Sequence, residues 1–246
     1  MTWTNRLRLF LGFVGVLLLV AACTLVFNQR QTEVTSVAAS IQAQEYAVGT
    51  DYGGTVTKEF VQEGDRVEVG DELFQVQSLQ LQQDIDNDVI SPDDTTSAYT
   101  LGPDGLMTFT AAVAGTMAKI DVKAGGYVQS GTELGTIDRA NSLFVSSNFI
   151  LTPRDYERIS RGANVDLQLP NTTVLAGTVR QITVETDVTG QAKTTVEVAS
   201  TDLKDGEYSG LTMPGTPVDA TLHLRDDGPL AGVSDGFHGF MRQIGL

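Results

Sequence analysis

The stretch Gly54-Thr-Val-Thr-Lys-Glu-Phe-Val-Gln-Glu-Gly-Asp-Arg-Val-Glu-Val-Gly-Asp-Glu-Leu-Phe-Gln-Val76 decides the fold of this chain, because it occurs twice. The second copy runs Gly115-Thr-Met-Ala-Lys-Ile-Asp-Val-Lys-Ala-Gly-Gly-Tyr-Val-Gln-Ser-Gly-Thr-Glu-Leu-Gly-Thr-Ile137, at a constant offset of 61 residues and without a gap. Apolar positions stay apolar in both copies, and the recurring glycines stay glycine. The chain is therefore built around an internal repeat.

The repeat predicts short strands joined by tight turns. Runs of nearly alternating β-branched residues are typical of half-buried strands, and glycine tolerates the positive φ angles that tight turns need. One copy alone buries too little apolar surface, so we expect the two copies to pack face to face as one β-sandwich with pseudo-twofold symmetry. The structural turn glycines are predicted to be Gly54, Gly64, Gly70, Gly115, Gly125 and Gly131.

The pattern G-x-V-x-x-x-x-V-x-x-G-D-x-V-x-x-G-(D/T)-E-L resembles half of a biotinyl/lipoyl-type domain, and the two halves cover residues 52–138. In lipoyl and biotin carriers a tight hairpin between the halves presents one modified lysine. This chain has no lysine between Lys58 and Lys119, and its halves are joined by the longer segment from Gln77 to Ala114. The resemblance therefore concerns the fold and implies no cofactor.

A lipoyl-like sandwich that is split by an insert and followed by further strands is similar to the membrane-fusion, or periplasmic adaptor, family of the hemolysin-secretion (HlyD) type. The resemblance implies a mainly β fold and a non-enzymatic adaptor that assembles outside the cytoplasmic membrane on a membrane exporter. That exporter would be an ABC-type transporter or another permease, and the adaptor would be a homo-oligomer. The alternative is a membrane-tethered module that binds the cell surface or cell wall, which leaves the split symmetry unexplained.

The predicted organisation has six parts. They are a cytoplasmic N-terminus (1–8), a transmembrane helix (9–27), a linker with a returning strand (28–51), a split biotinyl/lipoyl-like domain (52–138, with a short insert at 76–114), a β-barrel adaptor domain (139–225) and a C-terminal amphipathic helix (226–246).

The N-terminal segment from Leu9 to Phe27 contains no charged residue. A helix over this run would be about 28 Å long, close to the thickness of the hydrocarbon core of a bilayer. Arg6 and Arg8 precede it, and positive residues favour the cytoplasmic side. The segment therefore predicts a single-pass protein whose remaining chain lies outside the cytoplasmic membrane.

A second interpretation of the same segment remains open. Val20-Ala21-Ala22-Cys23 resembles the cleavage box of a bacterial lipoprotein, in which Cys23 would carry lipid. Against it, residues 24–27 prolong the apolar run beyond Cys23. Both interpretations leave the rest of the chain tethered to the membrane.

The chain is strongly acidic, with a net charge of −15 and an isoelectric point near 4.3. A net negative charge repels nucleic acid, so we expect no nucleic-acid partner. It also argues against binding to an anionic bilayer through a basic patch.

The insert between the copies predicts a short helix followed by a hairpin. Ser78 can cap a helix that places Leu81, Ile85 and Val89 on one face. Tyr99 to Thr110 has the pattern of a hairpin with its turn at Pro103-Asp104-Gly105. The prolines and the crowded aspartates of the insert exclude the long two-arm coiled coil of larger family members.

The run Asp84-x-Asp86-x-Asp88 has the spacing that opens a calcium-binding loop. Val89 stands where that loop needs glycine, and Thr95 stands where it needs glutamate. A solvated acidic loop is therefore favoured, and we expect no metal site.

After the second copy, the pattern predicts strands separated by turn residues and one short helix that begins after Thr152, with Tyr156 and Ile159 on its inward side. A strand near Glu33 to Ile41 is expected to return and pair with this barrel, and a second strand is expected near Glu45 to Val48. The barrel strands are expected within Ser142–Leu151, Asn164–Leu169, Gly177–Glu185, Thr194–Ala199 and Pro217–Leu224.

The C-terminal segment from Ser234 to Leu246 predicts an amphipathic helix. Its apolar stripe consists of Phe237, Phe240, Met241 and Ile244 at helical spacing. Two interpretations remain open for this stripe: packing against the barrel, or contact with the membrane surface or an exporter.

The inventory of reactive groups is poor for catalysis. The two histidines, His223 and His238, have no ligand partner at metal-binding spacing, the only cysteine is Cys23, and no glycine-rich phosphate loop occurs. We therefore predict no catalytic residues, no cofactor-binding residues and no enzyme activity.

Overall fold

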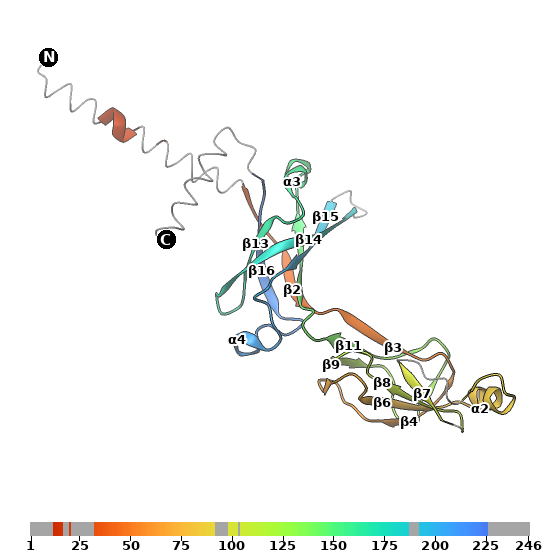
Figure 1. Ribbon diagram of the computed structural model, residues 1–246. Helices are drawn as coiled ribbons and strands as arrows, with labels where there is room; N and C mark the ends of the chain where they lie inside the picture. Colours follow the sequence, from red (N-terminus) through yellow and green to blue (C-terminus); the bar gives the residue numbers. More distant parts are fainter. Residues whose placement is uncertain are drawn as a thin grey trace, which may run out of the picture. The chain divides into compact units, whose positions relative to one another are not determined.

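The computed structural model describes residues 12–16, 20, 32–91, 98–102, 104–186 and 192–225 (Figure 1). The described part is mainly β and divides into two compact units. One unit consists of residues 42–143 and 204–210 and contains both copies of the repeat. The other consists of residues 1–41, 144–203 and 211–246. Each unit is described below by itself.

The first unit is a sandwich of two antiparallel sheets, with strand orders β3-β11-β9-β5 and β10-β4-β6-β8-β7. The predicted β-sandwich is therefore present. Its strands are β3 (Glu45–Gly49), β4 (Gly54–Glu59), β5 (Arg66–Val67), β6 (Glu72–Gln77), β7 (Tyr99–Leu101), β8 (Leu106–Thr110), β9 (Gly115–Ile120), β10 (Tyr127–Val128) and β11 (Glu133–Arg139).

The two copies exchange their short middle strands, which differs from the predicted packing of two separate half-sheets. β5 of the first copy pairs with β9 of the second, and β10 of the second pairs with β4 of the first. The exchange is reciprocal, because Gly64 N–H donates to Met117 O at 2.8 Å and Gly125 N–H donates to Val56 O at 2.7 Å. Unpaired sheet edges are unfavourable, and each copy covers an edge of the other. The copies therefore depend on each other to fold.

The repeat is longer in the structure than in the sequence. β3 and β8 occupy equivalent places, since β3 pairs with β11 and β8 pairs with β6 at the same offset of 61 residues. Thr50 and Ala111, which follow these strands, accept from Gly131 N–H at 2.7 Å and Gly70 N–H at 2.8 Å. The two strands share no identical residue at equivalent positions, so sequence comparison alone does not detect this part of the repeat.

The true insert is therefore residues 78–105, shorter than the predicted 76–114. It holds α2 (Leu79–Asp86), whose N-cap Ser78 accepts from Leu81 N–H, and then β7, which pairs with β8 as a hairpin. Leu81 is buried, as expected for the inner face of the helix. The prediction for Val89 was wrong: the helix ends before it, at Asn87, and Val89 is 70% exposed.

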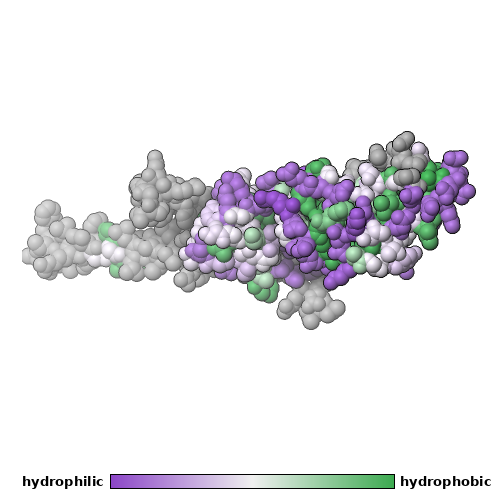
Figure 2. Space-filling model, turned by 90° about the horizontal axis from the view of Figure 1, so that it is seen from below, coloured by the Kyte–Doolittle hydropathy of each residue, from purple (hydrophilic) through white to green (hydrophobic). Residues whose placement is uncertain are grey.

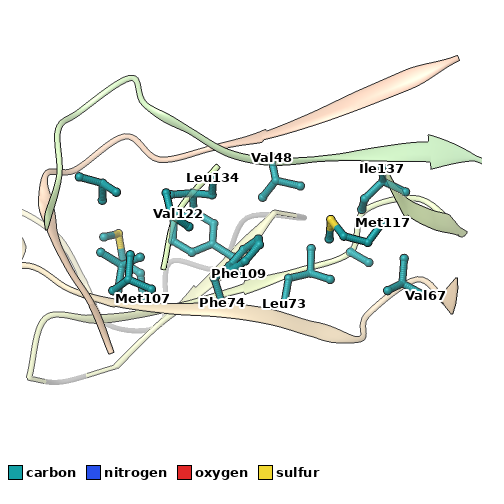
Figure 3. Close-up of a cluster of buried hydrophobic side chains, with 14 of the residues drawn as sticks. Val48, Val67, Leu73, Phe74, Met107, Phe109, Met117, Val122, Leu134 and Ile137 are labelled. Carbon is teal, nitrogen blue, oxygen red and sulfur yellow. The ribbon is translucent and has the colours of Figure 1, made fainter. Parts of the chain in front are cut away.

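The core of the sandwich draws on both copies and on the insert. Figure 3 shows side chains from the two sheets pointing toward each other, with Val48, Leu134 and Ile137 on one side and Leu73 and Phe74 on the other. Burial of aliphatic and aromatic side chains is the main favourable term in folding, so this shared cluster unites the copies. Its larger members also include Leu81, Met107, Phe109 and Met117.

The second unit is an antiparallel barrel. The order β16-β13-β14-β15-β12-β2 closes through a β16–β2 pairing, and β1 adds to the outer edge of β16. The prediction that the strand before the repeat returns to the barrel is confirmed. The elements are β1 (Glu33–Thr35), β2 (Ala38–Gln42), β12 (Phe144–Ile150), α3 (Pro153–Arg158), β13 (Asn164–Gln168), β14 (Val174–Thr186), β15 (Ala192–Ala199) and β16 (Pro217–His223); the one-turn α4 (Glu207–Gly210) belongs to the sandwich unit.

The helix α3 is capped as predicted but is shorter than expected. Thr152 accepts from Asp155 N–H, and Pro153 occupies the first turn. Ile159 is the extended C-cap residue and lies outside the helical turns. The expected inward side is therefore wrong for Tyr156, which is 47% exposed.

The chain ends were predicted to be membrane-associated, and both lie mainly outside the described residues. Among the described residues, none of the helices has the length and apolar character needed to cross a membrane. Most of the predicted segment 9–27, including Cys23, and the whole C-terminal segment 226–246 fall outside the described part of the chain.

Candidate functional site

Four of the six predicted turn glycines lie in turns with positive φ. The φ angles are 91° at Gly64, 96° at Gly70, 85° at Gly125 and 81° at Gly131. At these positions an added Cβ atom would meet no atom within 4 Å, so the backbone conformation is what requires glycine.

Gly54 and Gly115 are not turn residues, which corrects the prediction. They lie in β4 and β9, where another backbone approaches closely. A Cβ atom on Gly54 would be 2.3 Å from Gln77 O, and one on Gly115 would be 2.1 Å from Asp138 O. These glycines are therefore required by the close contact of neighbouring strands.

The turns around Gly64 and Gly125 are the surfaces that the repeat presents most symmetrically. Carboxylates of the first copy bind amides of the second: Glu63 Oε1 accepts from Ile120 N–H at 3.0 Å, and Glu59 accepts from Ala124 N–H. The equivalent residues of the second copy are these amide donors themselves and carry no carboxylate. The backbone is symmetric here, whereas the chemistry of the two turns differs.

The lysines of the repeat lie in strands and not in a hairpin between the halves. Lys58 in β4 has its Nζ 5.9 Å from the centre of the Phe60 ring. Lys119 in β9 forms an ion pair with Asp121, and this hydrogen bond raises the pKa of Lys119. Neither lysine occupies the place of the modified lysine in a carrier domain.

The barrel brings two carboxylates to His223, which sequence spacing did not reveal. His223 Nε2 lies 2.9 Å from Asp166 Oδ2, and its Nδ1 lies 3.9 Å from Glu33 Oε1. The carboxylates are on opposite sides of the ring, because β16 lies between β1 and β13. In the part of the chain that the structure describes, no group of three or more His, Cys, Asp and Glu side chains is arranged to hold a metal ion.

A second cluster of carboxylates surrounds Asp138 in the sandwich unit. Asp138 in β11 stands directly opposite Glu45 in β3. Burial raises the pKa of Asp138 above its usual value, and the negative charges of Glu45 and Asp205 raise it further. Like charges directly opposite each other destabilise a sheet.

Replacing Asp138 with Asn should therefore stabilise the sandwich at neutral pH. Because the pKa of Asp138 is raised in the folded state, its contribution to stability is full in acid and is lost as the pH rises through the folded pKa. Urea unfolding of Asp138→Asn should show less decline between acidic and neutral pH than wild type, and the exposed Asp86→Asn should match wild type. An unchanged pH profile in Asp138→Asn would show that Asp138 carries no strain.

The predicted exporter-contact stripe, Phe237, Phe240, Met241 and Ile244, and the predicted lipidation residue Cys23 lie outside the described residues. The structure therefore brings none of them together with the described surfaces.

No protein-family model and no curated protein sequence matches this chain. Solved structures do match its fold. ZneB from Cupriavidus metallidurans has a TM-score of 0.56 and 16% identity, with 78% of this chain and 99% of ZneB covered. MacA from Actinobacillus actinomycetemcomitans has a TM-score of 0.57 and 13% identity, with 78% of each chain covered.

A third structure, the membrane fusion protein Spr0693 from Streptococcus pneumoniae R6, has a TM-score of 0.50 and 16% identity, with 78% of this chain and 99% of Spr0693 covered. At such identities the likeness is one of fold. It agrees with the interlocked split sandwich, the insert between its halves and the barrel that receives the strand before the repeat. The chain therefore has the fold of the membrane-fusion, or periplasmic adaptor, proteins.

Proposed function

We propose that this chain is a non-enzymatic, membrane-anchored adaptor subunit of an efflux or secretion transporter. One observation carries the proposal: a lipoyl-like sandwich, split by an insert and lacking a carrier lysine there, stands in one chain with a barrel that takes back the strand preceding the repeat. This order of parts is the fold shared with the membrane fusion protein Spr0693. Assembly through surfaces is the activity that such a chain offers.

The proposed partners are a membrane exporter, ABC-type or another permease, and further copies of the chain. The short insert supports a limited reach, since α2 has 8 residues and β7 has 3. A helix of this length spans only about 12 Å. The adaptor would therefore act close to the exporter and would not extend a long coiled coil toward a distant channel.

The proposed anchor is the uncharged run 9–27, which places the sandwich and barrel outside the cytoplasmic membrane. Lipid on Cys23 is the alternative anchor and gives the same location. The stripe of Phe237, Phe240, Met241 and Ile244 is proposed as a contact with the exporter.

Protease added to intact, wall-stripped cells should remove the chain from about residue 31 onward and spare the N-terminus. The physical reason is that a proteolytic enzyme does not cross the bilayer, so only the outer part is accessible. A tag at each end, followed by immunoblotting, reports which part survives. Full protection of the sandwich and barrel would reverse the proposed topology.

The two anchors are separated by metabolic labelling with palmitate. Label that disappears in Cys23→Ala identifies a lipoprotein, whereas absence of label with retained membrane association identifies the uncleaved helix.

A further inference from the structure

Basic residues gather at one end of the barrel, although the whole chain carries a net charge of −15. Neighbouring strands are antiparallel, so the C-terminal ends of β12, β14 and β16 share one end of the barrel with the N-terminal ends of β13 and β15. We call this the α3 end, because α3 follows β12 there. Every Arg and Lys in the described part of the barrel unit belongs to it: Arg154, Arg158, Arg161, Arg180, Lys193 and Arg225.

Backbone contacts hold these basic residues to the same region. Arg225 N–H donates to Arg158 O at 3.1 Å, and Arg158 Nε donates to Arg225 O at 2.8 Å. Gly162 N–H, next to Arg161, donates to Val179 O at 2.9 Å, next to Arg180.

Fewer carboxylates share the α3 end. They are Glu33, Asp155, Glu157 and Glu185, and Asp155 is engaged with the capping hydroxyl of Thr152. Asp202 and Asp219 lie at the opposite end, after β15 and near the start of β16. The described part of the barrel unit is therefore basic at one end and acidic at the other.

The α3 end also exposes large apolar side chains. Ile150 is 64% exposed, Tyr156 is 47% exposed and Val184 is 41% exposed. Ile150 stands directly beside Lys193 in the pairing of β12 with β15. The opposite end exposes Val174 as well, at 57%, but without basic residues around it. Figure 2 shows apolar residues between hydrophilic ones on the face that it presents. Tyrosine, aliphatic and basic side chains together are the composition of surfaces that lie at a membrane interface.

The chain ends approach the membrane at this same end of the barrel. Glu33, the first residue of β1, pairs with His223 at the C-terminal end of β16. Only residues 28–32 separate Glu33 from the uncharged run 9–27. At about 3.5 Å per residue they span at most about 18 Å. If that run is the anchor, β1 holds the α3 end near the bilayer.

We propose that the α3 end of the barrel docks on an anionic lipid surface. This inference rests on the proposed function, because the anchor supplies the orientation. The net charge of the chain does not oppose it, since charges more than about 8 Å from the lipid are screened at physiological salt. The local excess of Arg and Lys decides the interaction, and the exposed Ile150 and Tyr156 enter the interface region. The surface thereby fixes the tilt of the barrel above the membrane.

The test uses the full chain in nanodiscs, with Cys23→Ala so that one introduced cysteine carries a fluorescent label. Ser160→Cys places the label beside Arg161 at the α3 end, and Thr201→Cys places it at the opposite end; both native residues are exposed. A nitroxide quencher attached to lipid should quench the label at 160 strongly and the label at 201 weakly. The difference should appear with phosphatidylglycerol in the nanodisc and disappear with phosphatidylcholine alone.

Neutralising Arg161 and Lys193 to Gln should lower the ratio of docked to undocked barrel by about 25-fold, since each basic residue near an anionic surface contributes about fivefold. Lys119→Gln with Lys204→Gln removes the same charge from the sandwich unit and should leave quenching unchanged. Equal quenching at 160 and 201, or quenching that ignores lipid charge, would overturn the proposal. So would protection of the label at 160 only when a membrane protein is present, which would assign the surface to a protein partner.

Carbonate extraction of the same nanodisc-forming membranes separates this inference from the proposed anchor. A chain that is retained but leaves the label at 160 in water overturns docking alone. A chain that is released overturns the anchor, and the docking inference with it.

Discussion

Val67→Asp should unfold the whole sandwich, whereas Val69→Asp should leave it folded. Val67 is 2% exposed and pairs with Gly115 of the second copy, while Val69, two residues further on, is 67% exposed. An uncompensated buried charge costs about 3–5 kcal/mol, which is a large part of the 5–15 kcal/mol that typically stabilises a domain. The same change at the exposed position costs little, so the pair isolates the effect of burial.

Urea unfolding followed by far-UV circular dichroism gives the free energy of unfolding of both variants. Val128→Asp, at the equivalent buried position of the second copy, should behave like Val67→Asp because each copy completes a sheet of the other. If Val67→Asp unfolds only the first copy and leaves the second with native spectra, the interlocked arrangement is wrong.

Gly115→Ala should destabilise the sandwich by about 3 kcal/mol, at the upper end of what overpacking costs. The new Cβ atom would lie 2.1 Å from the carbonyl oxygen of Asp138, so two backbones would have to separate. Gly54→Ala should have a similar effect, because its Cβ atom would lie 2.3 Å from Gln77 O. Both effects arise from the close approach of paired strands.

Gly125→Ala is the matched control for Gly115→Ala. Gly125 has a φ of 85° and open space around it, so alanine there costs only the strain of a left-handed conformation, about 1–2 kcal/mol. Thermal unfolding of the two variants should rank Gly115→Ala clearly below Gly125→Ala. Equal melting temperatures would mean that the strands at Gly115 relax without cost.

The repeat made the sandwich predictable, but only as far as its residues recur. Glycines and valines that solve the same turn and core problem twice revealed β4, β5, β6 and their second-copy equivalents. β3 and β8 stayed hidden as a pair, because a strand position requires only a side chain of suitable polarity. Val48 and Phe109 satisfy that requirement without being identical. The exchange of β5 and β10 is a tertiary choice that alternation of polar and apolar residues does not encode.

Sites formed by strand pairing were equally inaccessible to sequence. Glu33, Asp166 and His223 meet because β1, β16 and β13 are neighbours, and nothing in their spacing indicates it. The basic α3 end is a similar case, since its residues come from several strands and the net charge of the chain conceals them. The helical face expected for Tyr156 failed because α3 stops at Arg158, before a second turn could fix an inward side. The predictions for Cys23 and for the C-terminal stripe stay predictions.

The central claim, an adaptor on a membrane exporter, is tested most directly by native mass spectrometry of the full chain purified from membranes in mild detergent. The account predicts several copies of the chain bound in fixed ratio to one multi-span exporter, and loss of the exporter in Phe237→Ser with Phe240→Ser while the sandwich stays folded. A chain that purifies without any membrane transporter and binds isolated cell wall would contradict the account and favour a surface-binding module.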